Sequence, residues 1–285
     1  MNNNNKNTPP HEFEINLDAA FALIAPLTRL VARAGAAILA IDHASTKITG
    51  KADGSPVTEA DLAADHIIAE GLAELCPGIP TLSEERAHLA LAPFRGNFFL
   101  IDPLDGTKEF VGGRKEYTVN IALVSNGIPL LGLVGAPALG LIWRGLVGHG
   151  AERVELDPDG SPRTVFPITT RTMPKSGEPW VAAVSRSHGD ARTENFIDAK
   201  PGATRMELGS AVKFCRVAEG GADIYPRLAP TSEWDVAAGH ALLVAAGGLV
   251  TDSRGAPIYF GGIRPDFIVP EFIAWGDPEA AKSLA

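Results

Sequence analysis

The sequence predicts an α/β protein, because helical and strand patterns alternate along most of its 285 residues. Residues 17–41 carry apolar side chains at helical spacing, and an Asn-Gly pair at 126–127 separates two apolar runs of strand length. After residue 181, short apolar runs alternate with helical patterns. The length suits one large domain or two domains of roughly 100–180 residues each.

Composition restricts the class of protein. Hydrophobic residues make up 45% of the chain, which excludes a disordered protein. Lys and Arg total 25 against 34 Asp and Glu, a formal charge of −9, which argues against nucleic acid as a partner. A small anionic ligand requires a site where the local charge is reversed.

The N-terminal residues 1–12 are Asn-rich and contain no apolar run, so we expect a disordered tail and no signal peptide. The expected location is the cytoplasm, with peripheral attachment to the inner membrane as an alternative. Cys76 and Cys215 are far apart in apolar segments, so we expect two buried free thiols.

Two helices are expected in the first third of the chain. The helix over residues 17–41 has one apolar stripe, made of Leu23, Leu27, Leu30, Ala34 and Ile38. The second helix begins near Thr58, where residues 58–61 resemble a capping box. Its expected buried face is Leu62, Ile68, Leu72 and Leu75. Short strands are expected at 81–82 and 97–101.

The segment from Thr118 to Trp143 contains no charged residue and is long enough to cross a bilayer. Its two prolines, Pro129 and Pro137, and the Asn126-Gly127 pair favour antiparallel strands instead. We therefore expect strands over 119–125, 130–136 and 141–147, with a membrane helix as the alternative.

The prolines at 158, 162, 167, 174 and 179 predict a connecting region between two domains. We expect an N-terminal α+β domain over 13–170 and a C-terminal α/β domain over 171–285. The second domain is expected to contain strands at 181–185, 249–252 and 267–269 and helices near 210–219 and 233–246. Gly247-Gly248 supplies the end of the last helix.

The most informative chemistry lies in residues 98–110, where an apolar strand ends at two nearby carboxylates. Asp102 and Asp105 would repel each other unless a cation lies between them. Such hard oxygen donors suit Mg²⁺, and the carbonyl of Leu104 could add a neutral ligand. A helix that begins after Gly106 would present backbone N–H groups to a phosphate. The alternative is an ordinary Asp-Gly turn with Asp105 as a helix cap.

Three other acidic positions each allow a functional and a purely local interpretation. Glu84, in Ser-Glu-Glu 83–85, either begins a solvated helix or projects from a strand end. Asp235 completes a capping pattern with Ser232, and Asp61 can likewise be an ordinary acid in a first helical turn.

Together these segments coincide with a family signature. Pro-Val-Thr-Glu-Ala-Asp (56–61), Ser-Glu-Glu (83–85), Asp-Pro-Leu-Asp-Gly-Thr-Lys-Glu-Phe (102–110) and Trp-Asp-Val-Ala-Ala-Gly-His (234–240) resemble the inositol monophosphatase superfamily. Further matches are residues 184–188, 209–215 and 217–227, and the resemblance covers roughly residues 20–270. Within the superfamily, the chain resembles the CysQ-type 3′(2′),5′-bisphosphate nucleotidases, because Lys108-Glu109 replaces the Thr-Asn usual in inositol phosphatases.

The resemblance implies a layered α-β-α-β-α sandwich and a cluster of two or three Mg²⁺ ions. The implied metal ligands are Glu84, Asp102, the Leu104 carbonyl, Asp105 and Asp235. Thr107 and Asp61 would orient and deprotonate a metal-activated water that attacks the phosphate directly.

The resemblance also implies a substrate site. The scissile phosphate would meet the N–H groups of Gly106 and Thr107. The nucleotide and its second phosphate would contact Lys108, His188, Ser210, Lys213 and Arg227. The family usually has Ser-Ser where this chain has Ser210-Ala211. Taken singly, His188 could be an ordinary surface residue and Lys213 part of a solvated helix face.

The expected reaction is Mg²⁺-dependent hydrolysis of adenosine 3′,5′-bisphosphate to AMP and phosphate, within sulfur assimilation. Phosphoadenylyl sulfate is a second expected substrate, and lithium an expected inhibitor. The alternatives are a phosphatase for inositol or sugar phosphates with the same mechanism, or a phosphate-ligand sensor without catalysis. The expected partner is the small-molecule substrate, with no nucleic acid and no transmembrane segment. The oligomeric state stays open.

Overall fold

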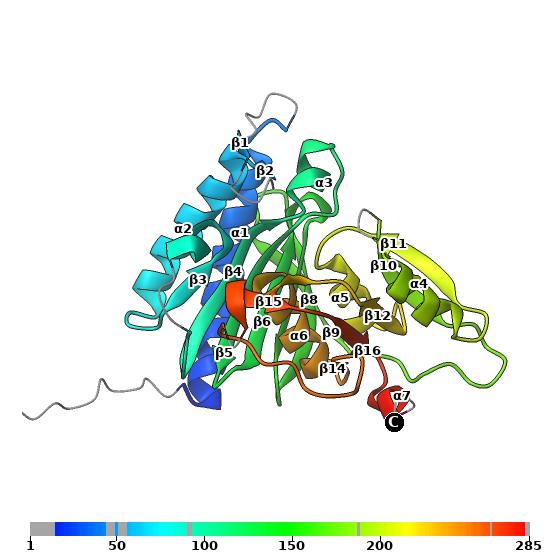
Figure 1. The fold of residues 1–285 in the computed structure, drawn as a ribbon. Coiled ribbons are helices and arrows are strands. Elements are labelled where there is room, and N and C mark those ends of the chain that lie inside the picture. The colour runs from blue at the N-terminus through cyan, green and yellow to red at the C-terminus, as the bar shows by residue number, and fades with distance from the viewer. Residues whose placement is uncertain are drawn as a thin grey trace, which may run out of the picture.

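The computed structural model describes residues 15–43, 49–50, 56–89, 93–186, 189–262 and 264–282. These residues form alternating layers of helix and sheet in the order α-β-α-β-α (Figure 1), as the family resemblance implies. The expected N-terminal tail and His188 lie outside the described residues.

The first layer contains α1 (Leu17–Leu39) and α2 (Glu59–Leu75), which pack against each other and against the larger sheet. The predicted stripe of α1 faces inward. The predicted buried face of α2 is half wrong, because Leu62 is 55% exposed and Leu75 is 38% exposed. Small residues face α1 instead: a Cβ atom on Gly71 would lie 2.4 Å from Leu30 Cδ1. The two helices therefore approach closely, and Leu62 and Leu75 turn outward, whereas Ile68 and Leu72 are buried as predicted.

The larger sheet has seven strands in the order β3-β4-β5-β6-β7-β8-β9, and only the β3–β4 pair is parallel. Its strands are β3 (Thr81–Ser83), β4 (Asn97–Asp105), β5 (Thr118–Ser125), β6 (Ile128–Ala136), β7 (Leu141–Leu146), β8 (Gly150–Leu156) and β9 (Pro162–Ile168). The predicted hairpin is confirmed, with Asn126 and Gly127 both at positive φ.

The prolines misled the prediction for residues 162–168. These residues form β9 at the edge of the sheet rather than a connection, although β9 contains Pro162 and Pro167. An edge strand tolerates proline because one side of its backbone makes no ladder hydrogen bonds.

The middle layer contains α5 (Val212–Ala218) and α6 (Glu233–Ala245). Helix α6 lies directly on β6, since a Cβ atom on Gly132 would be 2.1 Å from the carbonyl oxygen of Ala238. Beyond these helices lies a five-stranded sheet in the order β11-β10-β12-β16-β14. Its strands are β10 (Val181–Ser185), β11 (Thr204–Leu208), β12 (Ile224–Arg227), β14 (Leu249–Thr251) and β16 (Phe272–Trp275). The last layer is α4 (Ala191–Asp198) and α7 (Pro278–Ala281), which pack on this sheet (Figure 1).

Shorter elements connect these layers. They are β1 (Thr49–Gly50), β2 (Pro56–Val57), α3 (Thr107–Val111), β13 (Thr231–Ser232), β15 (Ile268–Val269) and the 3₁₀ helices at Glu84–Leu89, Pro137–Leu139 and Pro265–Phe267. Cys76 and Cys215 are buried free thiols, as predicted. Among the described helices, α1 alone is long and apolar enough to cross a membrane by length and composition. It also packs on the larger sheet, and core helices of water-soluble proteins meet the same criterion.

Candidate active site

A cavity of about 240 Å³ lies where the end of β4 faces α5, α6 and β12. Its lining contains most of the residues that the sequence singled out. Those residues are Glu84, Asp102, Leu104, Asp105, Gly106, Thr107, Lys108, Ser210, Lys213, Arg227 and Asp235. The fold therefore brings segments from both halves of the chain to one place.

The two carboxylates at the end of β4 are held differently. Asp102 is 1% exposed, and its carboxylate accepts the backbone N–H of Leu104 at 3.1 Å. The β4–β5 register shifts between Asp102 and Asp105, which lets both side chains reach the cavity. The Asp105 carboxylate lies 3.4 Å from both the Thr118 hydroxyl and the Asn120 amide of β5.

The electrostatics of these residues follow from their burial. Burial raises the pKa of Asp102 well above its usual range, and the charges of Glu84, Asp105 and Asp235 raise it further. Burial, together with Asp235, raises the pKa of Asp105 to about 6, although Lys213 and the Asn120 amide act in the opposite direction. The cluster is therefore unfavourable in its fully ionised form unless a cation joins it.

Glu84 and Asp235 reach the cavity from other elements. Glu84 follows β3 directly, and β3 runs parallel to β4, so Glu84 emerges at the same edge as Asp102. Asp235 lies in the first turn of α6, where its carboxylate accepts the Ser232 N–H at 3.2 Å and the Thr231 hydroxyl. Both sequence interpretations of Asp235 hold together, because it caps its helix and lines the cavity.

The donor set fits a hard divalent cation. The four carboxylates predicted as ligands and Leu104 line the cavity together with Glu109, and the mutual repulsion at Asp102 is what a cation relieves. Among the described residues, no three acidic, histidine or cysteine side chains already converge on one ion position. Both hydrogen bonds that Asp235 accepts end on Oδ2, and neither involves Oδ1.

Asp61 and Thr107 form a hydrogen-bonded pair beside the cavity. The Thr107 hydroxyl lies 3.1 Å from Asp61 Oδ1 and 3.3 Å from the Leu104 carbonyl oxygen. Asp61 Oδ2 accepts both the N–H and the hydroxyl of Thr58 at 2.7 Å, which fixes the carboxylate. Burial raises the pKa of Asp61, although the hydrogen bonds from Thr58 and Thr107 lower it. Asp61 is therefore a helix-capping residue that also orients Thr107.

Helix α3 begins at the cavity, as predicted. Gly106 precedes it with φ of 93°, a conformation that favours glycine. The first N–H groups of a helix have no partner within it, so those of α3 are available to a phosphate oxygen. The local sequence is therefore enough to predict both the turn and the helix start.

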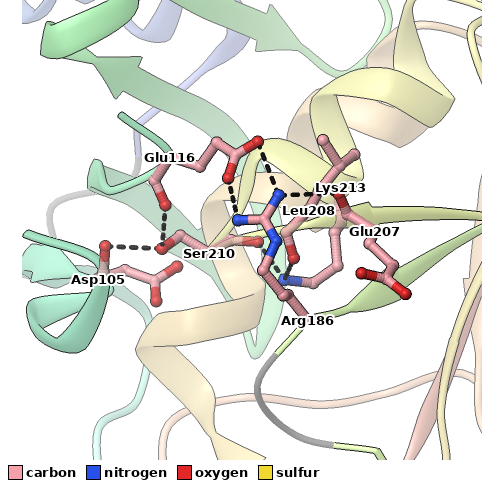
Figure 2. Close-up of polar contacts among 7 residues, drawn as sticks. All are labelled: Asp105, Glu116, Arg186, Glu207, Leu208, Ser210 and Lys213. Carbon is pink, nitrogen blue, oxygen red and sulfur yellow. Dashed lines mark hydrogen bonds and ion pairs between the residues drawn. The ribbon is translucent and has the colours of Figure 1, made fainter. Parts of the chain in front are cut away.

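The predicted substrate contacts differ in how they are engaged. Figure 2 shows the Ser210 hydroxyl between two backbone carbonyls, 2.8 Å from Asp105 O and 3.0 Å from Glu116 O. Lys213 is 3% exposed, and its ammonium group donates to the Ser210 carbonyl at 2.7 Å. Burial lowers the pKa of Lys213 to about 8, while Asp105 opposes that shift. Arg227 is half-buried and donates to the Pro230 carbonyl at 3.2 Å.

The cavity also contains residues that sequence reasoning missed. Tyr225, Ser185 and Phe272 line it. The Lys213 ammonium lies 5.3 Å from the centre of the Tyr225 ring, and burial raises the pKa of the Tyr225 hydroxyl. The signal for Tyr225 was its place two residues before Arg227 within the matched segment 217–227.

Comparisons with known proteins identify the family and the fold of this chain. The sequence profile described as the inositol monophosphatase family matches residues 22–282. The 3′(2′),5′-bisphosphate nucleotidase CysQ of Shigella flexneri is 39% identical over 254 residues, which cover 86% of this chain and 96% of the relative. The crystal structure of CysQ from Bacteroides thetaiotaomicron has a TM-score of 0.72 at 32% identity and covers 91% of this chain and 98% of its own. An inositol monophosphatase from Zymomonas mobilis has a TM-score of 0.70 at 25% identity, covering 93% and 98%.

Proposed function

This chain belongs to the inositol monophosphatase family, and we propose that it hydrolyses the 3′-phosphate of adenosine 3′,5′-bisphosphate to give AMP and phosphate. Relatives at 38–39% identity carry the name 3′(2′),5′-bisphosphate nucleotidase, and the match covers 96% of their length. Phosphoadenylyl sulfate is a second substrate under this proposal.

One observation carries the choice of a bisphosphate over a monophosphate. The same cavity that contains the carboxylate cluster also contains three cationic side chains, Lys108, Lys213 and Arg227. Lys213 interacts electrostatically with both Asp105 and Arg227, so the cationic and acidic groups are close together. A substrate with two phosphates can place one against the cluster and the other against the guanidinium of Arg227.

Members of this family are metal-dependent phosphatases, and we propose Mg²⁺, two or three ions, as the cofactor here. Glu84, Asp102, Asp105, Asp235 and the Leu104 carbonyl would hold the ions. When bound, the ions neutralise the phosphoryl oxygens and lower the pKa of water.

The protein's own residues position the water and the phosphate. Asp61 accepts a hydrogen bond from the Thr107 hydroxyl, which leaves the oxygen of Thr107 free to accept a hydrogen bond from the attacking water. As the water oxygen bonds to phosphorus, its proton passes to Thr107 Oγ1 and the Thr107 proton passes to Asp61 Oδ1. The bond from phosphorus to the ribose 3′-oxygen breaks, and that oxygen takes a proton from solvent water to leave as the 3′-hydroxyl of AMP. The N–H groups of Gly106 and Thr107 hold the phosphate oxygens.

The division into an N-terminal domain over 13–170 and a C-terminal domain over 171–285 belongs to this proposal. It is supported by sheet membership, because the larger sheet ends at Ile168 and the smaller begins at Val181. A cytoplasmic location is also part of the proposal.

The test compares substrates on the purified chain with Mg²⁺ present. We expect kcat/KM for adenosine 3′,5′-bisphosphate to exceed that for inositol 1-phosphate by at least about a hundredfold, the size of one charge-assisted contact. Phosphate release should stop when EDTA removes the metal and return when Mg²⁺ is restored. A tenfold preference for the inositol ester would reject the nucleotide assignment.

A further inference from the structure

Three backbone segments pack against one another at the wall of the cavity. They are Asp105–Gly106 at the end of β4, Glu116 just before β5, and Gly209–Ser210 at the start of α5. Figure 2 shows Ser210 between the other two segments. The contact joins the larger sheet to the half of the chain that carries α5 and α6.

The packing leaves no room at either glycine. A Cβ atom on Gly106 would lie 2.1 Å from the Ser210 hydroxyl oxygen, and one on Gly209 would lie 2.4 Å from the Glu116 carbonyl oxygen. Ser210 itself has a φ of 48°, an uncommon conformation for a residue other than glycine. The position of the Ser210 hydroxyl is therefore fixed by several constraints at once.

The Ser210 hydroxyl has one proton and faces two carbonyl oxygens, those of Asp105 and Glu116. Its proton is therefore already engaged within the protein. This arrangement differs from a residue that donates a hydrogen bond to a substrate. The Asp105 peptide is consequently held by Ser210, while the Asp105 carboxylate is held by Thr118 and Asn120.

An ion pair fixes the segment that contains Glu116. Arg186 directly follows β10. Its guanidinium group makes two hydrogen bonds to the Glu116 carboxylate, one of them at 3.1 Å. The same guanidinium donates to the Glu207 carbonyl at 3.1 Å. Arg186 thus ties Glu116 to β11, which leads directly into the Ser210 turn (Figure 2). A paired fork of this kind restricts orientation more than a single charge contact does.

We propose that Ser210, Glu116 and Arg186 form a clamp that positions the Asp105 backbone for metal binding, and that none of the three contacts the substrate. The inference deepens the proposed function, since it rests on Asp105 being a metal ligand. It reassigns Ser210 from substrate binding to positioning. The clamp is tested by measuring the affinity of the protein for metal in the absence of any substrate.

The experiment measures Mg²⁺ and Mn²⁺ binding by calorimetry on the full chain, and kcat and KM separately. Ser210→Ala should weaken metal binding about tenfold, the effect of one hydrogen bond, and lower kcat at subsaturating metal. Its KM at saturating metal should change by less than about twofold. Glu116→Gln and Arg186→Met should each weaken metal binding by about threefold or more, and their double variant should be no worse than the stronger single variant.

A matched control uses another bidentate ion pair that does not line the cavity. Arg171 donates two hydrogen bonds to Asp223, at 2.6 and 2.8 Å. Arg171→Met should lower the melting temperature without changing the affinity for metal. If it weakens metal binding as much as Arg186→Met does, the clamp has only a general structural role and the proposal is wrong.

Other results would also overturn the clamp. A Ser210→Ala variant that raises KM tenfold with unchanged metal affinity would make Ser210 a substrate contact. Should that variant fail to fold, Glu116→Gln still decides, because unchanged metal affinity in a folded Glu116→Gln protein contradicts the clamp. The calorimetry measures metal binding without substrate, so it is independent of which substrate the protein prefers. A preference for another phosphate ester in the activity assay would therefore reject the nucleotide assignment and leave the clamp intact. A wild-type chain that binds no metal would overturn both.

Discussion

The hydroxyl of Thr107 lies 3.1 Å from the carboxylate of Asp61, across 46 positions of sequence. Asp61 is itself fixed by two hydrogen bonds from Thr58, so the direction of the Thr107 hydroxyl is set by the first turn of α2. The N-terminal helix layer thereby reaches the cavity through one side chain.

Replacing Thr107 by valine should abolish most of the activity. Valine has a methyl group in place of the hydroxyl, so it keeps the shape of the side chain but cannot pass a proton from the attacking water to Asp61. We expect kcat to fall by about 10²–10⁴-fold with metal affinity unchanged. Thr107→Ser retains the hydroxyl and should keep kcat within about tenfold of the wild type. Steady-state phosphate release and metal calorimetry measure both quantities. A Thr107→Val protein with kcat within threefold of wild type would contradict the assigned proton transfer.

Replacing Asp102 by asparagine should stabilise the metal-free protein, because the variant removes one buried charge from a repulsive cluster while the amide oxygen still accepts the Leu104 N–H. Added Mg²⁺ at 100 times Kd should increase the free energy of unfolding of the wild type by about 2.7 kcal/mol and so raise its melting temperature. The melting temperature of the variant should rise much less. Differential scanning fluorimetry with and without Mg²⁺ tests this.

The control for Asp102→Asn is Glu70→Gln, which removes an exposed carboxylate on α2. It should change neither the metal-free melting temperature nor the Mg²⁺ response. An equal Mg²⁺ response in Asp102→Asn and wild type would show that Asp102 does not hold the ion.

His240 should make the protein sensitive to mild acid. Its ring is buried on α6 at 5.6 Å from the Phe260 ring, its Nδ1 has no hydrogen-bond partner, and burial lowers its pKa to about 4. The folded protein keeps this ring neutral, whereas the unfolded chain binds a proton below about pH 6.5. The stability that His240 contributes is present above pH 6.5 and is lost as the pH falls towards 4, by about 2 kcal/mol between pH 7 and pH 5.

Urea unfolding at pH 7 and pH 5 measures that loss for the wild type and for His240→Phe. Other groups titrate in the same range, so the informative quantity is the difference between the two proteins. The loss of unfolding free energy should be about 2 kcal/mol smaller in His240→Phe. Equal losses in both proteins would show that His240 is not the group responsible.

Arg227 should distinguish substrates by the number of their phosphates. Arg227→Met should raise KM for adenosine 3′,5′-bisphosphate about 10–100-fold, because a charge-assisted contact to the 5′-phosphate is lost. KM for adenosine 3′-monophosphate, which lacks that phosphate, should stay within about twofold. Equal changes for both nucleotides would place Arg227 at the scissile phosphate or give it a purely structural role.

Local patterns were sufficient to predict much of the fold. The Asn126-Gly127 turn, the capping box at Thr58 and the strand over 181–185 depend on residues that are close in sequence, and all three are present. The outward position of Leu62 and the strand over 162–168 could not be predicted in this way. The first depends on how closely α1 approaches α2, and the second on a place at the edge of a sheet.

The same distinction applies to the candidate site. Asp102, Asp105 and Thr107 belong to one short motif, so their grouping is evident from neighbouring positions in the chain. The Glu116–Arg186 pair joins residues 70 positions apart and has no local signature. The segment around Ser210 was sufficient to predict that this residue belongs to the site. Its hydroxyl contacts the carbonyl oxygens of Asp105 and Glu116, which are about a hundred residues away in sequence, so these contacts could not be predicted from neighbouring residues.

The side chains at and beside the cavity come from residues as far apart in sequence as Asp61 and Asp235, which has a consequence for folding. Contacts between distant parts of a chain form late, because the entropy of closing long loops must be overcome first. On a ribosome, Asp235 emerges after the whole larger sheet has been synthesised, so the lining of the cavity is complete only once α6 docks on β6. That docking brings the carboxylate of Asp235 close to those of Asp102 and Asp105, so the repulsion within the acidic cluster arises only in the docked chain.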